Sequence, residues 1–290
     1  MPRERLTLPG GAQLTVHRLD RCYPHHVGNK GPKLQARLAG LVASGVEAIV
    51  SVGGAYSNHL HALAATGHRL GLRTVGIVCG VHADLDNPTL RDAARWGMVI
   101  RRVDRATYAR RASPVFVRWL ARAYPAHTLI PEGGNDPAGV AACRALAPRL
   151  QLTDCRALVV PMGTGATVTG LRQGLSSARA LVAANVVGAA GERSVASSIA
   201  GPLETVDAAR AGYGRVDAPL LDFLARSYAQ TGVLFDPLYS GKAAFWCAKA
   251  GCPQLHLLHT GGLQGWRGFA ERGALARHPA LAAAVANLRF

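Results

Sequence analysis

Short apolar runs alternate with segments of helix length along most of this 290-residue chain. We expect strands over residues 48–54, 74–80, 98–103, 128–134, 157–163, 185–191 and 254–262. The segments between them place apolar residues at helical spacing, as 57–71 does with Leu60, Leu63 and Leu70. Strand–helix alternation is typical of parallel sheets with helices on both faces, so the predicted fold class is α/β.

Four of the expected strands end in glycine-rich loops that open a helix. These loops contain Gly53-Gly54, Gly133-Gly134, Gly163 to Gly165 and Gly261-Gly262. In open α/β sheets a ligand sits at the carboxyl ends of the strands, so we expect the four loops to build one composite site. For any single loop, a tight turn that needs glycine is the better explanation.

The composition is that of a well-packed globular protein, with 49% hydrophobic and 17% charged residues. The formal net charge of +16 raises the question of a nucleic-acid partner. The arginines are scattered, however, and the one dense cluster, residues 101–111, alternates with apolar residues in a way that predicts one solvated helix face. No zinc-finger spacing or RNA-recognition motif accompanies it, so we expect no nucleic-acid partner.

The six cysteines show no C-x-x-C spacing, and several lie in apolar runs. We therefore expect reduced, buried thiols and no metal site. The first residues, MPRERLTLPGG, lack the apolar stretch of a signal peptide, and no run of about 18 apolar residues occurs. The expected location is cytoplasmic, with no membrane partner.

The segment VVPMGTGATVTGL (159–171) predicts a strand, a glycine-rich turn and a helix start. Backbone N–H groups there could hold a phosphate, and Thr164 and Thr167 add hydroxyl donors. A dinucleotide site would need a third glycine where Val168 stands, so a single phosphate monoester fits better. A phosphate site together with a lysine in GNKGPKL (28–34) suggests pyridoxal 5'-phosphate, whose aldehyde needs one lysine.

Six motifs occur in a recognisable order: GNKGPKL (28–34), SVGGAYSNH (51–59), PEGGN (131–135), GTGAT (163–167), DPLYSGKA (236–243) and HTGGLQG (259–265). Together they resemble the 1-aminocyclopropane-1-carboxylate deaminase / D-cysteine desulfhydrase family of fold-type II, or tryptophan synthase β-like, pyridoxal phosphate enzymes. The resemblance implies two open parallel-sheet α/β domains with the cofactor in the cleft between them. The smaller domain would be residues 34–144, and the larger would combine 1–33 with 145–290. It also implies a homodimer.

The resemblance implies these cofactor contacts. Lys30 would form the Schiff base, and Lys33 would face the phosphate. Asn58 would bond the ring hydroxyl, and Ser240 would face the pyridine nitrogen. The phosphate would be held by the loop Gly163, Thr164, Gly165, Ala166 and Thr167.

On the substrate side, the resemblance implies that Ser57, Asn58 and His59, at a helix start, hold the substrate carboxylate, where N–H groups and the helix dipole favour an anion. Tyr213 and Tyr239 would line the same side. The catalytic set would be Lys30, Ser57 and Tyr239. For the tyrosines, a half-buried packing role with a satisfied hydroxyl is the alternative.

The implied reaction is β-elimination from a small amino acid, which would convert D-cysteine to sulfide, pyruvate and ammonia. Lys30 would remove the Cα proton. The ring-opening deaminases of the family carry a glutamate where this chain has Ser240, and a neutral hydroxyl favours prompt β-elimination over cyclopropane opening. Three alternatives stay open: a ring-opening deaminase, a pyridoxal phosphate protein without turnover, and a nucleic-acid-binding module that only the charge suggests. Gly31 and Pro32, between the two lysines, depart from the family pattern, so the substrate could differ there.

Overall fold

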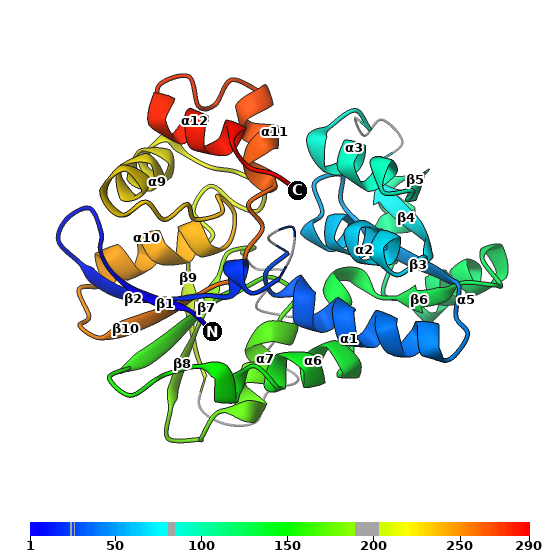
Figure 1. Ribbon diagram of the computed structural model, residues 1–290, viewed down its shortest axis with the longest axis horizontal. Helices are drawn as coiled ribbons and strands as arrows, with labels where there is room; N and C mark the ends of the chain where they lie inside the picture. Colours follow the sequence, from blue (N-terminus) through cyan, green and yellow to red (C-terminus); the bar gives the residue numbers. More distant parts are fainter. Residues whose placement is uncertain (24, 26, 81–84, 189–202) are drawn as a thin grey trace. The chain divides into compact units, whose positions relative to one another are not determined.

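The computed structural model describes residues 1–23, 25, 27–80, 85–188 and 203–290 (Figure 1). The chain divides into two compact units, and each is described by itself. Unit 1 comprises Met1–Asn29 and Gly139–Phe290, and unit 2 comprises Lys30–Ala138. The domain limits expected from the sequence, with a small domain over 34–144, stay a prediction.

Unit 1 is built on one sheet with the strand order β1-β2-β10-β7-β8-β9. The strands are β1 (Arg3–Thr7), β2 (Gln13–Arg18), β7 (Ala157–Met162), β8 (Ala180–Asn185), β9 (Glu204–Asp207) and β10 (Leu255–His259). β1 pairs antiparallel with β2, and every other neighbouring pair in this sheet is parallel. The carboxyl ends of β2, β10 and β7 therefore meet at one edge.

Helices cover both faces of the unit 1 sheet (Figure 1). They are α6 (Pro137–Arg144), α7 (Ala166–Gly174), α9 (Ala218–Thr231), α10 (Ser240–Ala250), α11 (Gly265–Glu271) and α12 (Pro279–Ala286). The first two residues of α6 belong to unit 2. Successive residues of β7 point to opposite faces, as in any strand. Leu158 packs in one core cluster with Val168 of α7, whereas Val159 packs in another with Phe245 of α10. The near-continuous apolar strands follow from this two-sided burial.

Unit 2 has a fully parallel sheet with the strand order β5-β4-β3-β6. Its elements are α1 (Lys30–Ala43), β3 (Ala48–Gly53), α2 (Asn58–Arg69), β4 (Arg73–Cys79), α3 (Pro88–Arg95), β5 (Val99–Val103), α4 (Arg105–Ala109), α5 (Pro114–Ala123), β6 (Thr128–Ile130) and a 3₁₀ turn (Glu132–Gly134). Val50 and Ile77 pack against Phe116 of α5. On the other face, Leu60 of α2 lies over Gly76. The α/β class with helices on both faces is confirmed for both units.

The strand expected over 185–191 is wrong in position. β8 ends at Asn185, whose side-chain oxygen accepts hydrogen bonds from the N–H groups of Val187 and Gly188 and turns the chain. Residues 189–191 lie outside the part that the structure describes. The apolar run VVG follows the strand instead of forming it.

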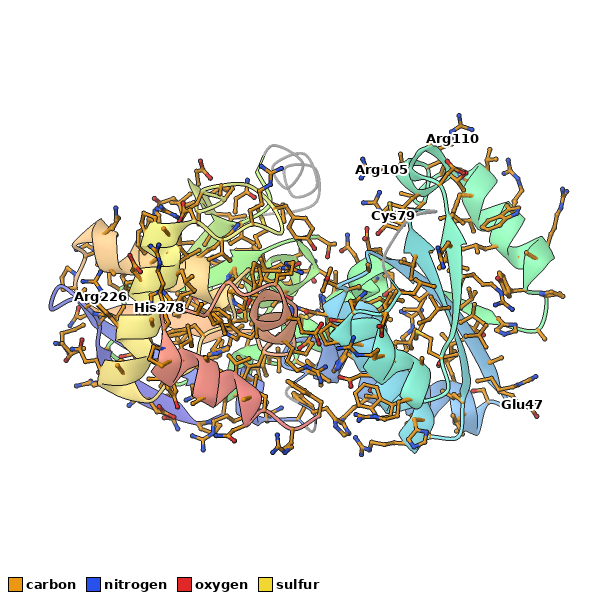
Figure 2. The ribbon with its side chains drawn as sticks, turned by 90° about the horizontal axis from the view of Figure 1, so that it is seen from above. Glu47, Cys79, Arg105, Arg110, Arg226 and His278 are labelled. Atoms are coloured by element: carbon orange, nitrogen blue, oxygen red, sulfur yellow. The ribbon has the colours of Figure 1, made fainter. Side chains whose placement is uncertain are left out.

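The single helix face expected over 101–111 is also wrong. Residues up to Val103 belong to β5, and Asp104 caps α4 by accepting a hydrogen bond from the Thr107 N–H at 2.8 Å. Arg105 and Arg110 of this segment are exposed and lie at the same end of the unit 2 sheet as Cys79, the last residue of β4 (Figure 2). The arginine cluster is solvated, but it is divided between a strand and a short helix.

The prediction of buried thiols is confirmed for Cys143, Cys155 and Cys247, whereas Cys22 and Cys79 are partly exposed and Cys252 is exposed. Within the described residues, no helix has the length and apolar character needed to cross a membrane. The same residues include no group of three His, Cys, Asp or Glu side chains that could hold a metal ion.

Candidate active site

Lys30 and Lys33 lie in the first turn of α1, where the sequence predicts a helix to start. Lys30 is its first residue, and Lys33 is 2% exposed although its side chain is charged. Both Nζ atoms lie 3.4 Å from the carbonyl oxygen of Gly133. The two amines, predicted to have separate partners on a cofactor, thus share one acceptor in unit 2.

The loop that carries this carbonyl follows β6 and is fixed by its backbone and by a side-chain cluster. Gly133 and Gly134 have φ values of 70° and 64°, which favour glycine. The neighbouring Glu132 accepts hydrogen bonds from the Tyr108 hydroxyl and, at 2.5 Å, from Arg111 Nε. Burial, together with this carboxylate, raises the pKa of Tyr108 far above its usual value, so the hydroxyl stays a donor. The sequence gives no local signal for this cluster, because Tyr108 and Arg111 lie more than 20 positions from Glu132.

Ser57 and Asn58 lie where β3 gives way to α2, as predicted. The Ser57 hydroxyl accepts a hydrogen bond from the Leu60 N–H at 3.2 Å and so caps the helix. A Cβ atom on Gly53 would lie 2.6 Å from the Ser57 Oγ, so only glycine lets the loop turn this tightly. The first N–H groups of a helix have no partner within it, which makes this end of α2 suited to an anion.

His59, the second residue of α2, is buried and has one unpartnered nitrogen. The Ser51 hydroxyl donates to the carbonyl oxygen of Ile130 at 2.6 Å, so it must accept a hydrogen from His59 Nε2 at 2.9 Å. Among the residues that the structure describes, His59 Nδ1 has no hydrogen-bond partner. Burial, followed by the charges of Lys30 and Lys33, lowers the pKa of His59 well below 6.5. The ring is therefore neutral, and Nδ1 is a buried acceptor.

In unit 1, the predicted phosphate loop joins β7 to α7. Gly165 caps the helix in a left-handed conformation with φ 89°, and within the described residues no side-chain hydrogen bond caps this end. A Cβ atom on Gly163 would lie 3.0 Å from the ring of Tyr239. The Asn29 side chain donates a hydrogen bond to the Thr167 hydroxyl at 3.0 Å. Thr164 and Ala166 lie in the same turn, so the predicted set Gly163 to Thr167 forms one loop.

The carboxyl end of β10 holds the residue just before Lys30. Gly28 has φ 53°, and a Cβ atom there would lie 1.9 Å from the Thr260 carbonyl oxygen. The same oxygen accepts a hydrogen bond from the Asn29 N–H at 3.0 Å. The glycine of GNKG is thus required by direct backbone contact with the HTGG loop.

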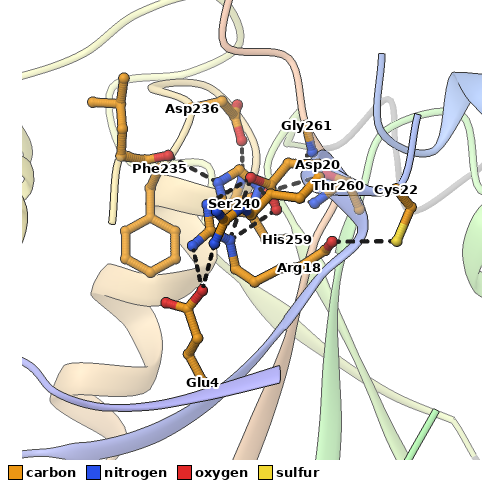
Figure 3. Close-up of polar contacts among 12 residues, drawn as sticks. Glu4, Arg18, Asp20, Cys22, Phe235, Asp236, Ser240, His259, Thr260 and Gly261 are labelled. Atoms are coloured by element: carbon orange, nitrogen blue, oxygen red, sulfur yellow. Dashed lines mark hydrogen bonds and ion pairs between the residues drawn. The ribbon is translucent and has the colours of Figure 1, made fainter. Parts of the chain in front are cut away.

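Ser240 begins α10 and is completely buried (Figure 3). Its hydroxyl oxygen accepts a hydrogen bond from the Thr260 N–H at 3.0 Å and lies 3.3 Å from the Thr260 hydroxyl. The Asp236 carboxylate accepts hydrogen bonds from three N–H groups, those of Leu238, Tyr239 and Ser240. Burial raises the pKa of Asp236, while His259, the N–H groups of Ser240 and Tyr239 and the Ser240 hydroxyl oppose the rise. The Asp236 carboxylate therefore binds backbone N–H groups at the start of α10. The side chain at position 240 itself is a neutral hydroxyl.

His259, the last residue of β10, makes hydrogen bonds to backbone groups through both of its ring nitrogens. Nε2 lies 2.9 Å from the Leu234 carbonyl oxygen, which can only accept, and Nδ1 accepts from the Gly261 N–H at 3.2 Å. Asp20, held by Arg18 at 2.7 Å, lies 3.8 Å from Nδ1 (Figure 3). The imidazole therefore fixes the HTGG loop on which Thr260 lies.

Tyr239 and Tyr213 form a pair, with their hydroxyl oxygens 3.2 Å apart and their rings edge to face. Tyr213 is 59% exposed. The structure thus brings the predicted residues together in two sets. Unit 2 holds Lys30, Lys33, Ser57, Asn58 and His59, and unit 1 holds the Gly163–Thr167 loop, Tyr213, Tyr239 and Ser240. Asn29, Asp236, His259 and Thr260 were missed as individual residues, although each lies in a motif that drew attention.

Residues 29–249 match the family model described as pyridoxal-phosphate dependent enzyme. The chain belongs to this family. It is 25% identical over 285 residues to a Pyrococcus horikoshii protein provisionally named 1-aminocyclopropane-1-carboxylate deaminase, covering 88% of this chain and 86% of the relative. It is also 25% identical over 302 residues to the mitochondrial bifunctional D-cysteine desulfhydrase/1-aminocyclopropane-1-carboxylate deaminase of Arabidopsis thaliana, covering 89% and 74%.

Solved structures give the same fold. The crystal structure of an ACC deaminase homologue superposes with a TM-score of 0.76 at 20% identity over 94% of this chain and 93% of the other. That of O-ureido-L-serine synthase superposes with a TM-score of 0.67 at 18% identity over 94% and 92%. The protein is therefore a pyridoxal phosphate-dependent enzyme of fold-type II.

Proposed function

We propose that this enzyme carries out β-elimination on a small amino acid, as a D-cysteine desulfhydrase does. The observation that supports the choice is the environment of Ser240. Its hydroxyl oxygen accepts the Thr260 N–H and lies 3.3 Å from the Thr260 hydroxyl, so this position offers a ring nitrogen a neutral hydroxyl and not a carboxylate. A hydroxyl donor leaves that nitrogen unprotonated, which suits a substrate whose leaving group departs readily. Opening a cyclopropane ring requires a stronger electron sink, which a protonated ring nitrogen would provide.

The residues present fit pyridoxal phosphate. The end of α7 has a left-handed glycine and no side-chain cap, which leaves its first N–H groups to bind a phosphate. Lys30 would carry the aldehyde, Lys33 would balance the phosphate charge, and Asn58 would bond the ring hydroxyl. When bound, the cofactor supplies an electron sink for the carbon next to its imine nitrogen. That both sets of residues serve one cofactor is part of the proposal.

The remaining residues orient the substrate and move its protons. The N–H groups of Asn58 and His59 and the Ser57 hydroxyl would hold the substrate carboxylate at the positive end of α2. His59 Nδ1, as a neutral acceptor, would take a hydrogen bond from a donor on the ligand. The Lys30 amine would remove the Cα proton, and Tyr239, with Tyr213, would face the leaving group. For D-cysteine and water, the products would be pyruvate, ammonia and hydrogen sulfide.

The test is to supply the holoenzyme with D-cysteine, L-cysteine, D-serine and 1-aminocyclopropane-1-carboxylate, and to measure pyruvate, 2-oxobutanoate and sulfide. We expect pyruvate and sulfide in equal amounts from a cysteine, and neither from the Lys30→Ala variant. Rapid 2-oxobutanoate formation with no pyruvate would overturn the proposal in favour of a ring-opening deaminase. Cofactor bound through Lys30 without any product would indicate a protein that binds pyridoxal phosphate without turnover.

A further inference from the structure

Tyr213 lies on a strained segment between β9 and α9. Arg210 has φ 53°, a left-handed conformation that is unusual for a residue with a side chain, and Gly212 and Gly214 have φ values of 96° and 74°. The Arg210 guanidinium donates two hydrogen bonds to Asp217 Oδ2, from Nη2 at 2.8 Å and from Nε at 3.1 Å. This segment therefore needs outside contacts to keep its shape.

Lys242 supplies such contacts from the interior of unit 1. It lies in the first turn of α10 and is 1% exposed. Its Nζ donates to the carbonyl oxygen of Ala209 at 2.8 Å and to that of Gly212 at 2.7 Å. Both acceptors are backbone atoms on the strained segment, on either side of Arg210. Lys242 therefore ties the start of α10 to the turn that carries Tyr213.

Burying this ammonium is costly, which argues for a purpose beyond stability. Burial lowers the pKa of Lys242 to about 8, opposed by Asp217 and Asp236, with Arg210 adding to the fall and Asp207 opposing it. An apolar side chain of similar length would fill the space without the cost of desolvating a charge. The structure instead uses the charge to fix two carbonyl groups.

The same short stretch of α10 connects Lys242 to the candidate site. Tyr239 and Ser240 lie just before Lys242 in the chain. Tyr239 contacts Tyr213 through its hydroxyl and packs its ring beside Gly163 of the phosphate loop. A shift of the segment 209–214 would therefore move the Tyr213 hydroxyl away from Tyr239.

We propose that Lys242 is a positioning residue that determines substrate fit, because it fastens the segment 209–214 so that the Tyr213 hydroxyl meets Tyr239. The proposal rests on the proposed function only in taking these two tyrosines as the substrate side. The fastening itself is a property of unit 1. Lys242 does not act on the substrate, so its loss should alter substrate binding more than the chemical step.

The test compares Lys242→Met with Lys249→Met in the holoenzyme. Lys249 is an exposed lysine on the same helix. Lys242→Met removes both charged hydrogen bonds, and the loss of one alone has an effect of about tenfold, so we expect amide hydrogen exchange in 209–214 to become at least about tenfold faster. For D-cysteine, we expect KM to rise by a similar factor of about ten while kcat changes by less than about twofold. The cofactor absorption spectrum should not change, and Lys249→Met should behave as the wild type.

Lys242→Arg, which keeps the charge but moves the donors, serves if Lys242→Met does not fold. We expect it to show the same split between KM and kcat at a smaller size. Faster exchange in 209–214 with an unchanged KM would overturn the positioning role and leave a structural one. Unchanged exchange would overturn the fastening as well.

A wild-type enzyme with no turnover would refute the proposed function and leave the fastening testable. The fastening is then tested by a double-mutant cycle, in which urea denaturation gives the free energy of unfolding of Lys242→Met, Tyr213→Phe and the double variant. We expect the two changes to be non-additive, because Lys242 acts on Tyr213. Strictly additive effects would contradict the inference.

Discussion

Each unit of this enzyme places a buried histidine beside candidate active-site residues, and the two histidines are bonded differently. His259 in unit 1 is fully buried and uses both ring nitrogens to hold backbone groups. His59 in unit 2 is 2% exposed, and its Nδ1 has no partner in the described part of the chain. A buried polar atom without a partner costs stability, so its persistence suggests that a ligand completes it. We therefore expect His259 to support the site structurally and His59 to act on a ligand.

Amide substitutions at His59 give the largest expected effect, because they separate its two nitrogens. In His59→Gln the amide can reach the Nε2 position and keep the Ser51 contact, but nothing replaces Nδ1. In His59→Asn the amide can stand at Nδ1 instead. We expect His59→Gln to lower kcat/KM by about tenfold to a hundredfold, the effect of one lost hydrogen bond to a ligand, and His59→Asn to lower it less.

The measurement is steady-state kinetics on D-cysteine, with thermal unfolding as the check on folding. His259→Gln is the counterpart in unit 1, and there we expect the larger effect on the unfolding temperature. If the two histidines gave the same pattern of effects, the contrast between a ligand contact and a structural one would be refuted.

Asp236→Asn tests how firmly unit 1 holds its part of the site. The two carboxylate oxygens accept three backbone N–H groups, and an amide offers only one acceptor oxygen. At least one buried N–H group would lose its partner, so we expect a loss of about 1–3 kcal/mol in the free energy of unfolding. Urea denaturation gives the value. Asp222→Asn, on an exposed carboxylate of α9, is the matched control and should change stability little.

The elements that carry the site could be predicted from the sequence, whereas their side-chain contacts could not. Lys30 and Ser57 lie at helix starts. Such starts can be predicted, because a glycine-containing loop before a helix is a local signal in the sequence. The bond from Ser51 to Ile130, which makes His59 an acceptor, joins residues 79 positions apart. The edge strands β1 and β9 were also missed, because exposed residues interrupt their apolar pattern. Local signals predict secondary structure, and distant pairs decide the chemistry of each side chain.

Ser57 variants can separate helix capping from anion binding in unit 2. Ser57→Ala removes the acceptor for the Leu60 N–H and should cost about 1 kcal/mol of stability. Ser57→Asp keeps an effective cap, because aspartate is as good a capping residue as serine. Its charge would repel a substrate carboxylate, so we expect the KM for D-cysteine to rise by about tenfold while stability is retained.

Kinetics and thermal unfolding on both Ser57 variants distinguish the two roles. A Ser57→Asp enzyme with an unchanged KM would mean that the substrate carboxylate binds elsewhere. The cofactor affinity, measured by absorbance titration, should be the same in both variants, since the phosphate is assigned to α7.

His17 tests whether a buried histidine nitrogen without a partner is enough to indicate a ligand contact. Its Nε2 lies 3.0 Å from His256 Nδ1 in the unit 1 sheet, and its own Nδ1 has no partner among the described residues. None of the site residues described above contacts it in the part of the chain that the structure describes. If an unpartnered nitrogen by itself marked a ligand site, His17→Gln would lower kcat/KM as His59→Gln does. We expect no such change.

The expected effect of His17 is on acid stability. Burial, followed by the charge of His256, lowers the pKa of His17 from 6.5 to about 4. The folded state therefore binds a proton less readily than the unfolded state. The stabilising contribution is complete above pH 6.5 and is lost as the pH falls towards 4, at up to about 1.4 kcal/mol per pH unit. Urea unfolding between pH 7 and 4 should show a shallower decline in His17→Gln, and an unchanged slope would contradict the assignment. A shallower decline with unchanged kcat/KM at pH 7 would mean that an unpartnered nitrogen indicates a ligand only where, as at His59, lysine amines and a helix start lie beside it.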